Sequence, residues 1–306
     1  MASIDEMMGQ LADSTKRLTK SQFAGLSDLS STDAMRFKEL WLGLGAVRRR
    51  HLIAQLSSEA EANVQLNYDM VFTSCLSDPD EVVRATAIEG LWECQEPGLI
   101  GILISLLKKD SSVTVKKAAA RALGVFVLLA EWGKIRPRYK EQLETSLLSV
   151  IKDDTLDSEL RQRALESLSY LSHEEIIDII KAAYQGTSKA MKVSALRSMG
   201  RNSDSRWLDV LLKELSSPEA DLRAEAALAC GELGDEKAVL NLIKSTEDED
   251  SRVQVAAIKA LGQISGRRAV KALVALCKHT EMEIKKAAEE ALREAQFASD
   301  PMSSVI

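Results

Sequence analysis

Basic residues recur along the chain at a spacing that could bind phosphate groups. Each follows an aliphatic residue on an expected helix, and the set is Arg84, Lys116, Arg161, Lys192, Arg223 and Lys285. Four of them have an acid four positions earlier, namely Asp80, Asp157, Glu219 and Glu281. An acid and a base at that spacing pair on a helix surface and contribute roughly 0.2–0.5 kcal/mol. We therefore predict that these cations form structural pairs within their own helices rather than a phosphate-binding row.

The sequence carries no catalytic or metal-binding motif. Its three histidines, His51, His173 and His279, are dispersed, and no HExxH or Cys/His ligand spacing occurs. Helical-repeat di-iron hydroxylases are built on several His-Glu pairs, whereas this chain has one, His173-Glu174. Gly-rich phosphate loops and GxSxG turns are also missing from the sequence. We expect a protein that is not an enzyme and that binds no metal or cofactor.

The amino-acid composition indicates which class of partner the protein can bind and in which compartment it is expected. The formal net charge of −6 offers no excess of positive charge for a phosphate backbone, which disfavours nucleic acid. The four cysteines occur singly, without a CxxC pair, as expected for reduced thiols in a cytoplasmic protein. No run approaches the roughly 20 apolar residues that span a bilayer. We expect a cytoplasmic protein without membrane insertion.

The basic residues lie on a helix that repeats. From Arg84 to Lys285, the corresponding positions of successive copies are separated by 32, 45, 31, 31, 31 and 31 residues. A second, preceding helix keeps the same period, and its copy at Leu208, Leu211, Leu212 and Leu215 has the i, i+3, i+4, i+7 spacing of one apolar face. Because neither helix can bury its face alone, the sequence predicts stacked pairs of antiparallel helices.

The period also predicts the organisation of the chain. We expect an N-terminal segment with a weak amphipathic helix at 1–30, one repeat array at 31–297 with clear repeats at 68–295, and a disordered tail at 298–306. The long 45-residue step contains an insertion at about 126–139. Glycines are expected to end second helices at Gly124, Gly200, Gly231 and Gly262. Asp78 is expected to cap the helix that follows it.

The repeated segment resembles a known family. The stretch VLNLIKSTEDEDSRVQVAAIKALGQISGRRAVKALVALCKH has a leucine-rich first helix, an acidic turn and a second helix of the form V-R/K-x-x-A-A/I-x-x-L-G. It is similar to the short HEAT repeats, in particular the HEAT-like class first associated with phycobilisome lyases. This resemblance implies an all-α fold, a right-handed α-α superhelix or solenoid of about 7–8 antiparallel helix pairs.

By the same resemblance, the second helices should line a concave surface that binds a protein or peptide partner. The protein would then be a non-catalytic scaffold or adaptor. Exposed second-helix positions predicted to face that surface are Glu89, Lys117, Arg121, Arg163, Glu166, Arg197, Glu225 and Lys259. The insertion adds a second candidate contact, a loop that carries Trp132, Arg136 and Arg138.

Two other functions stay open at this point. The chain could bind nucleic acid like the HEAT-like alkylpurine glycosylases, through basic and aromatic residues at 48–50, 134–138 and 201–207. It could also be a bilin-lyase-like subunit with a tetrapyrrole groove. The sequence leaves the identity of the partner and the oligomeric state open.

Overall fold

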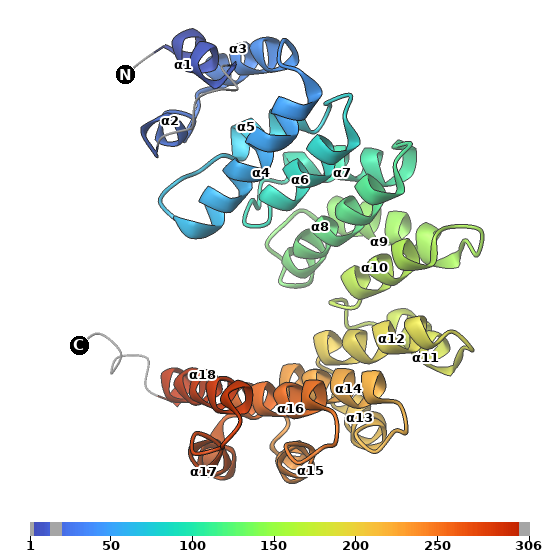
Figure 1. The fold of residues 1–306 in the computed structure, drawn as a ribbon. Coiled ribbons are helices and arrows are strands. Elements are labelled where there is room, and N and C mark those ends of the chain that lie inside the picture. Colours follow the sequence, from blue (N-terminus) through green and yellow to red (C-terminus); the bar gives the residue numbers. More distant parts are fainter. Residues whose placement is uncertain (1–2, 13–19, 300–306) are drawn as a thin grey trace. The chain divides into compact units, whose positions relative to one another are not determined.

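The computed structural model describes residues 3–12 and 20–299, which form helices and connecting turns and contain no strand (Figure 1). After two N-terminal helices, eight helix pairs follow one another in sequence. This confirms the predicted all-α array of about seven to eight pairs. The chain divides into two compact units, Met1–Leu160 and Arg161–Ile306. Most of the tail predicted to be disordered, at 300–306, lies outside the described residues.

Unit 1 begins with two short helices and continues as helix pairs. Its helices are α1 (Ile4–Ala12), α2 (Lys20–Ala24), α3 (Ser31–Leu42), α4 (Ala46–Ala62), α5 (Asp69–Cys75), α6 (Glu81–Gly90), α7 (Gly98–Lys109), α8 (Val113–Glu131) and α9 (Pro137–Lys152). The second helices α4, α6 and α8 contact one another in order. Helix α1 buries Ile4, Met8 and Leu11 and packs on α3, so the N-terminal amphipathic face covers the first pair.

Unit 2 consists of two helical layers (Figure 1). One layer contains the second helices α12 (Lys189–Asn202), α14 (Ala220–Leu233), α16 (Ser251–Ile264) and α18 (Met282–Ser299), which follow α10 (Ser158–Leu168). The other contains the first helices α11 (Glu174–Gln185), α13 (Leu208–Glu214), α15 (Val239–Ser245) and α17 (Gly266–Leu276). Turns η1 (Ser205–Trp207) and η2 (Glu236–Ala238) lead into α13 and α15. The predicted apolar face of α13 is buried at Leu208, Leu211 and Leu215.

The glycines predicted to end second helices lie inside them instead. Helices α12 and α14 continue past Gly200 and Gly231 and end at Asn202 and Leu233. Gly124 and Gly262 likewise lie within α8 and α16. The residues that follow α12, α14 and α16 adopt a positive φ, and they are Ser203, Gly234 and Ser265. The prediction was wrong by two residues at Gly200, Gly231 and Gly262 and by seven at Gly124, where α8 continues to Glu131. The glycine serves packing at Gly231 and Gly262 rather than helix termination.

These interior glycines let consecutive second helices approach closely. A Cβ atom added at Gly231 would lie 2.8 Å from the Cα atom of Ala260 on the next second helix. At Gly262 the same atom would lie 2.9 Å from the Cα atom of Ala291. Such separations are too short for two carbon atoms, so any side chain here would push the helices apart.

The insertion lengthens helices and leaves only a short loop. Helix α8 runs to Glu131, and Gly133, with φ 67°, turns the chain away from it. Pro137 then begins α9, where its fixed φ suits the first helical position. The extra residues of the 45-residue step therefore extend α8 and α9, and the exposed connection is 132–136.

Candidate functional site

An arginine ladder connects three of the second helices, α4, α6 and α14, each to the next repeat. It consists of three ion pairs, Arg49–Asp78, Arg84–Asp110 and Arg223–Asp248. In the second and third pairs, the guanidinium donates two hydrogen bonds of 2.8 Å to the carboxylate. Each aspartate lies in the turn of the following helix pair. The ladder therefore fixes the spacing between consecutive repeats.

The ladder corrects two predicted pairs. Arg84 and Arg223 do not bind the acids four residues earlier, because each reaches a carboxylate in the next turn. That geometry gives two charge-assisted bonds and is stronger than a single pair along one helix surface. Lys285 likewise lies nearest Glu289, at 4.0 Å, and not Glu281.

The aspartates of the ladder share a position in the repeat that was not predicted from the sequence. Each stands two residues before the N-cap of a second helix, in the segments Asp78–Asp80, Asp110–Ser112 and Asp248–Asp250. Each accepts a backbone N–H from that N-cap residue at 2.8 or 2.9 Å. Asp78 was predicted to be the cap, but Asp80 caps α6. Asp78 is buried and binds Arg49, so its role is to join repeats.

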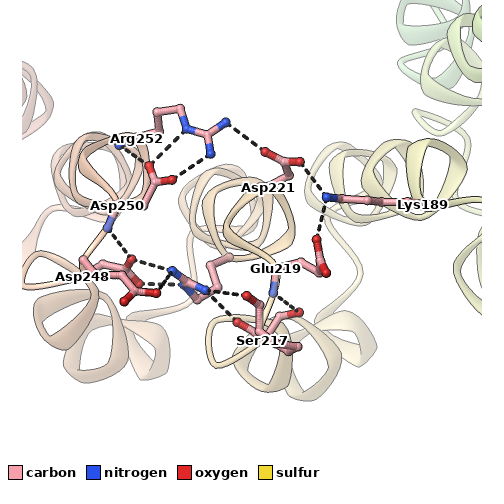
Figure 2. Close-up of polar contacts among 10 residues, drawn as sticks. Lys189, Ser217, Glu219, Asp221, Asp248, Asp250 and Arg252 are labelled. Carbon is pink, nitrogen blue, oxygen red and sulfur yellow. Dashed lines mark hydrogen bonds and ion pairs between the residues drawn. The ribbon is translucent and has the colours of Figure 1, made fainter.

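A chain of exposed ion pairs runs along one edge of unit 2 (Figure 2). Lys189 binds Glu219 at 2.6 Å and Asp221 at 2.9 Å. Arg252 binds Asp221 at 2.9 Å and Asp250 at 2.7 Å. The beginnings of α12, α14 and α16 are thus linked through alternating charges. Exposed pairs of this kind contribute little to stability, so the edge mainly fixes the positions of its own side chains.

The Arg223–Asp248 pair should make the stability of unit 2 sensitive to acid. The hydrogen bond from Arg223 lowers the pKa of Asp248 below its ordinary 3.8. Stability from this pair is present above pH 3.8 and is lost as the pH falls through the folded pKa. We expect Arg223→Gln to lose less stability than the wild type as the pH falls from 3.8 through the folded pKa of Asp248. Urea unfolding at each pH measures this, with Lys271→Gln on α17 as the control. Equal acid losses in wild type and Arg223→Gln would contradict the assignment.

The second-helix strip of unit 2 contains several of the residues predicted from the sequence. We define it as Arg163, Glu166, Arg197, Arg201, Glu225 and Glu232. At its centre, Arg197 donates to Glu166 at 2.8 Å and to Glu225 at 2.9 and 2.6 Å. One guanidinium therefore joins carboxylates from α10 and α14 across α12.

Two residues of the strip are not exposed, contrary to prediction. Glu166 and Glu225 are buried, whereas the side chain of Arg197 is 30% exposed. A buried carboxylate needs hydrogen bonds, and Glu166 receives a further one from the Ser194 hydroxyl at 2.8 Å. The strip thus presents its arginines to solvent and holds two of its acids beneath them. A role for these residues in binding a partner stays a prediction.

In the outer part of the strip, arginine and glutamate side chains lie close enough to offset each other's charge. Arg163 lies 3.2 Å from Glu166, and Arg201 lies 3.9 Å from the same carboxylate. The Glu232 carboxylate reaches across to Gly200, and burial raises the pKa of Glu232 above its ordinary value. Arg201 was a candidate only for nucleic acid, and Glu232 was not among the candidate residues. The sequence does indicate both. Arg201 lies four residues after Arg197 and Glu232 lies seven residues after Glu225, so each shares a helix face with a residue of the strip.

The remaining second-helix candidates fall into two groups. Lys117 is engaged by Asp157 at 3.0 Å and by Glu159 at 2.7 Å. Glu89, Arg121 and Lys259 are exposed, and no ion pair joins any of the three to another residue in the described part of the chain. These three side chains are therefore available to a partner.

The candidate loop after α8 already pairs its aromatic rings with its own cations. Trp132 is 59% exposed, and the Lys134 ammonium lies 4.7 Å from the centre of its ring. The Arg138 guanidinium lies 4.8 Å from the ring of Tyr139. Arg136 is exposed and precedes the first residue of α9. A partner contact at Trp132, Arg136 and Arg138 stays a prediction.

Two of the three segments considered for nucleic acid, 48–50 and 201–207, pair with acids of the protein itself, whereas Lys134, Arg136 and Arg138 of the third are exposed. Arg49 and Arg50 pair with acids at the next turn. Arg206 binds Asp204 at 2.8 Å, and Trp207 is buried. Such residues do not form an exposed basic surface for a phosphate backbone.

The described residues contain neither a cluster of metal ligands nor a helix suited to a membrane. Residues 3–12 and 20–299 hold no group of three or more His, Cys, Asp or Glu side chains that could bind a metal ion. Within the same ranges, every helix is too short or too polar to cross a bilayer.

The stacked helix pairs and the arginine ladder define a helical-repeat solenoid. A family model described as HEAT repeats matches residues 70–154 and 208–293, more than half of the sequence. The chain belongs to the HEAT-repeat family. This confirms the resemblance read from the repeated segment. A comparison with curated proteins finds no significant match.

Similar folds occur among solved structures. A chain from the complex of CpcE and CpcF of phycocyanin lyase from Nostoc is 18% identical, with a TM-score of 0.50, over 78% of this chain and 94% of that one. Human deoxyhypusine hydroxylase is 17% identical, with a TM-score of 0.37, over 96% of each chain. Kap121p is 15% identical, with a TM-score of 0.46, over 96% of this chain and 38% of that one. At these identities the likeness concerns the fold alone.

Proposed function

We propose that this protein is a non-catalytic scaffold that binds a protein or peptide partner on the surface of its second helices. The observation that carries the proposal is the second-helix strip of unit 2. There, neighbouring repeats hold charged side chains in fixed positions, with the arginines partly exposed. Membership of the HEAT-repeat family supports the same function.

The packing favours the second helices as the binding surface. In unit 2, α12, α14, α16 and α18 contact one another more extensively than the first helices α13, α15 and α17 do. The glycine contacts at Gly231 and Gly262 are the reason for this closeness. A layer that packs more tightly than its partner layer lies on the inside of a bend, so we expect the second helices to line the concave side.

The chemistry of the strip suits a protein better than a polyanion. Arg163, Arg197 and Arg201 are 34%, 30% and 28% exposed in their side chains. Three carboxylates lie beneath or beside them, so the strip has no net positive charge for a phosphate backbone. Partly exposed arginines held in place by neighbours are common at protein interfaces, because little side-chain entropy is lost on binding.

Charge reversal tests the proposal. Full-length protein is used to capture partners from extract of the cells that produce it. We expect Arg121→Glu combined with Lys259→Glu to reduce the captured partner about tenfold, which corresponds to a loss of roughly 1.4 kcal/mol. Both residues are exposed, so the fold should be retained.

The matched control carries the same charge change on first helices. Lys213→Glu combined with Lys271→Glu alters exposed residues of α13 and α17. This variant should capture as much partner as the wild type. Equal loss in both variants would show that the second-helix surface has no special role.

A further inference from the structure

A small cavity of about 250 Å³ lies in unit 1 between the turns of two consecutive repeats. The turn after α4 contributes Val64 and Leu66, α5 contributes Asp69, and the turn after α6 contributes Trp92 and Glu93. Trp92 is 54% exposed and Val64 is 83% exposed. The cavity is smaller than the roughly 300–1,000 Å³ of ordinary small-molecule sites, so its size suits one side chain.

One wall of the cavity contains a polar group without a partner. Tyr68 lines the cavity with its ring against Phe72, 6.2 Å between centres. Its side chain is buried, yet its hydroxyl makes no hydrogen bond to any residue in the described part of the chain. Burial, together with the Glu59 carboxylate, raises the pKa of Tyr68 to about 12. The hydroxyl oxygen has almost no accessible surface, so a group in the cavity does not reach it without a shift of the neighbouring side chains.

The chain segment that forms the cavity is acidic. Residues 52–107 contain nine acidic residues and a single lysine or arginine, Arg84, which binds Asp110. Two of the nine acids, Asp78 and Asp80, are bound by Arg49 and Arg50. Asp69 and Glu93 line the cavity, and no ion pair neutralises either of them among the described residues. Asp69 accepts a hydrogen bond from the Cys94 thiol, but neither carboxylate has a cationic partner. Two such carboxylates beside an exposed indole ring attract a cation through both charge and the face of the ring.

We propose that this cavity binds an arginine side chain of a basic peptide segment, with Trp92 against the guanidinium plane and Asp69 and Glu93 as its carboxylate partners. The proposal rests on the scaffold function above and adds the chemistry of a partner at a second surface. Among the described residues no cation lies over the Trp92 ring, whereas the Lys134 ammonium lies 4.7 Å from the centre of the Trp132 ring.

The cavity favours arginine over lysine for a geometric reason. A guanidinium is planar, carries five N–H donors and stacks on aromatic faces, so it can contact the indole ring and two carboxylates at the same time. An ammonium group is compact and strongly hydrated and satisfies fewer of these contacts at once.

The test is a titration of the full-length protein with a short peptide, followed by NMR of the tryptophan indole N–H groups. The peptide is acetyl-Gly-Gly-Arg-Gly-Gly-amide, and Trp92→Phe identifies the resonance of Trp92. We expect this resonance to move saturably, while that of Trp132 stays unchanged. Glu93→Gln and Asp69→Asn should each weaken binding about threefold to fivefold, as expected for loss of one exposed charge contact.

Three control peptides distinguish recognition of arginine by the cavity from a general attraction of cations to acidic residues. The same peptide with citrulline keeps the shape but removes the charge, and it should leave the Trp92 resonance in place. The lysine peptide should bind more weakly than the arginine peptide, and the glutamate peptide should not bind. Glu89→Gln, an exposed acid that does not line the cavity, should leave the affinity unchanged.

The proposal is overturned if the arginine peptide does not move the Trp92 resonance, if citrulline or lysine binds as well, or if Glu93→Gln has no effect. These outcomes are independent of partner capture by the second helices. Loss of capture in Arg121→Glu combined with Lys259→Glu, with no arginine binding at Trp92, would retain the scaffold function and reject only the arginine cavity.

Discussion

Replacing Gly262 by alanine is expected to lower the free energy of unfolding by about 1–3 kcal/mol. The new Cβ atom would lie 2.9 Å from the Cα, Cβ and carbonyl oxygen atoms of Ala291 on α18. None of these atoms belongs to a flexible side chain, so the two second helices must separate. On an exposed helix the same substitution would stabilise by up to about 1 kcal/mol, because alanine is the better helix former. The contact should outweigh this gain.

Urea unfolding followed by circular dichroism measures the effect. The matched control is Gly101→Ala on α7, because a Cβ atom there meets no atom within 4 Å. The control should be as stable as the wild type or slightly more stable. If Gly262→Ala were also neutral or stabilising, close glycine packing would not be the basis of the second-helix layer.

Asp78→Asn is expected to destabilise unit 1 by about 3–5 kcal/mol, the cost of leaving one buried charge without its partner. The carboxylate lies 2.9 Å from the Arg49 guanidinium and accepts a hydrogen bond of 2.8 Å from the Trp41 indole. The side chains of Asp78 and Arg49 are 0% and 8% exposed. Asparagine keeps the shape and a hydrogen-bond acceptor but removes the counter-charge of Arg49.

The thermal midpoints of three further variants test this explanation. Arg49→Met combined with Asp78→Asn removes both charges and should recover about 1 kcal/mol or more of the loss. Asp5→Asn removes the carboxylate of an exposed pair with Arg36 and should leave the midpoint unchanged. Arg49→Met alone should be destabilised like Asp78→Asn. A double variant less stable than either single variant would argue against a charge effect.

The sequence was sufficient to predict the helix pairs but not the contacts between them. Period and apolar spacing are properties of one helix, and they placed the buried face of α13 at Leu208, Leu211 and Leu215. The role of Gly231 and Gly262 depends on the distance to the next repeat. Glycine at a helix end and glycine inside a tightly packed helix look alike in a single sequence, so the two could be told apart only from the coordinates.

The charged residues show the same limit of prediction from sequence, because their partners lie in other repeats. Arg223 was paired with Glu219 because both lie on one helix, but the structure pairs it with Asp248, 25 residues later. Glu166 and Glu225 were expected to be exposed by analogy with other HEAT-like repeats, and Arg197 allows their burial by binding both. Glu89, Arg121 and Lys259 are exposed, and their exposure could be predicted from one helix alone. Pairing between repeats needs the three-dimensional arrangement.

Site-specific photo-cross-linking tests the central claim most directly. A photoreactive amino acid is placed at Lys259 on α16 or at Lys271 on α17, and each full-length variant is produced in its native cells. The scaffold function predicts one cross-linked partner from Lys259 and none from Lys271. A partner that cross-links only from Lys271, equally from both positions or from neither would contradict binding by the second helices.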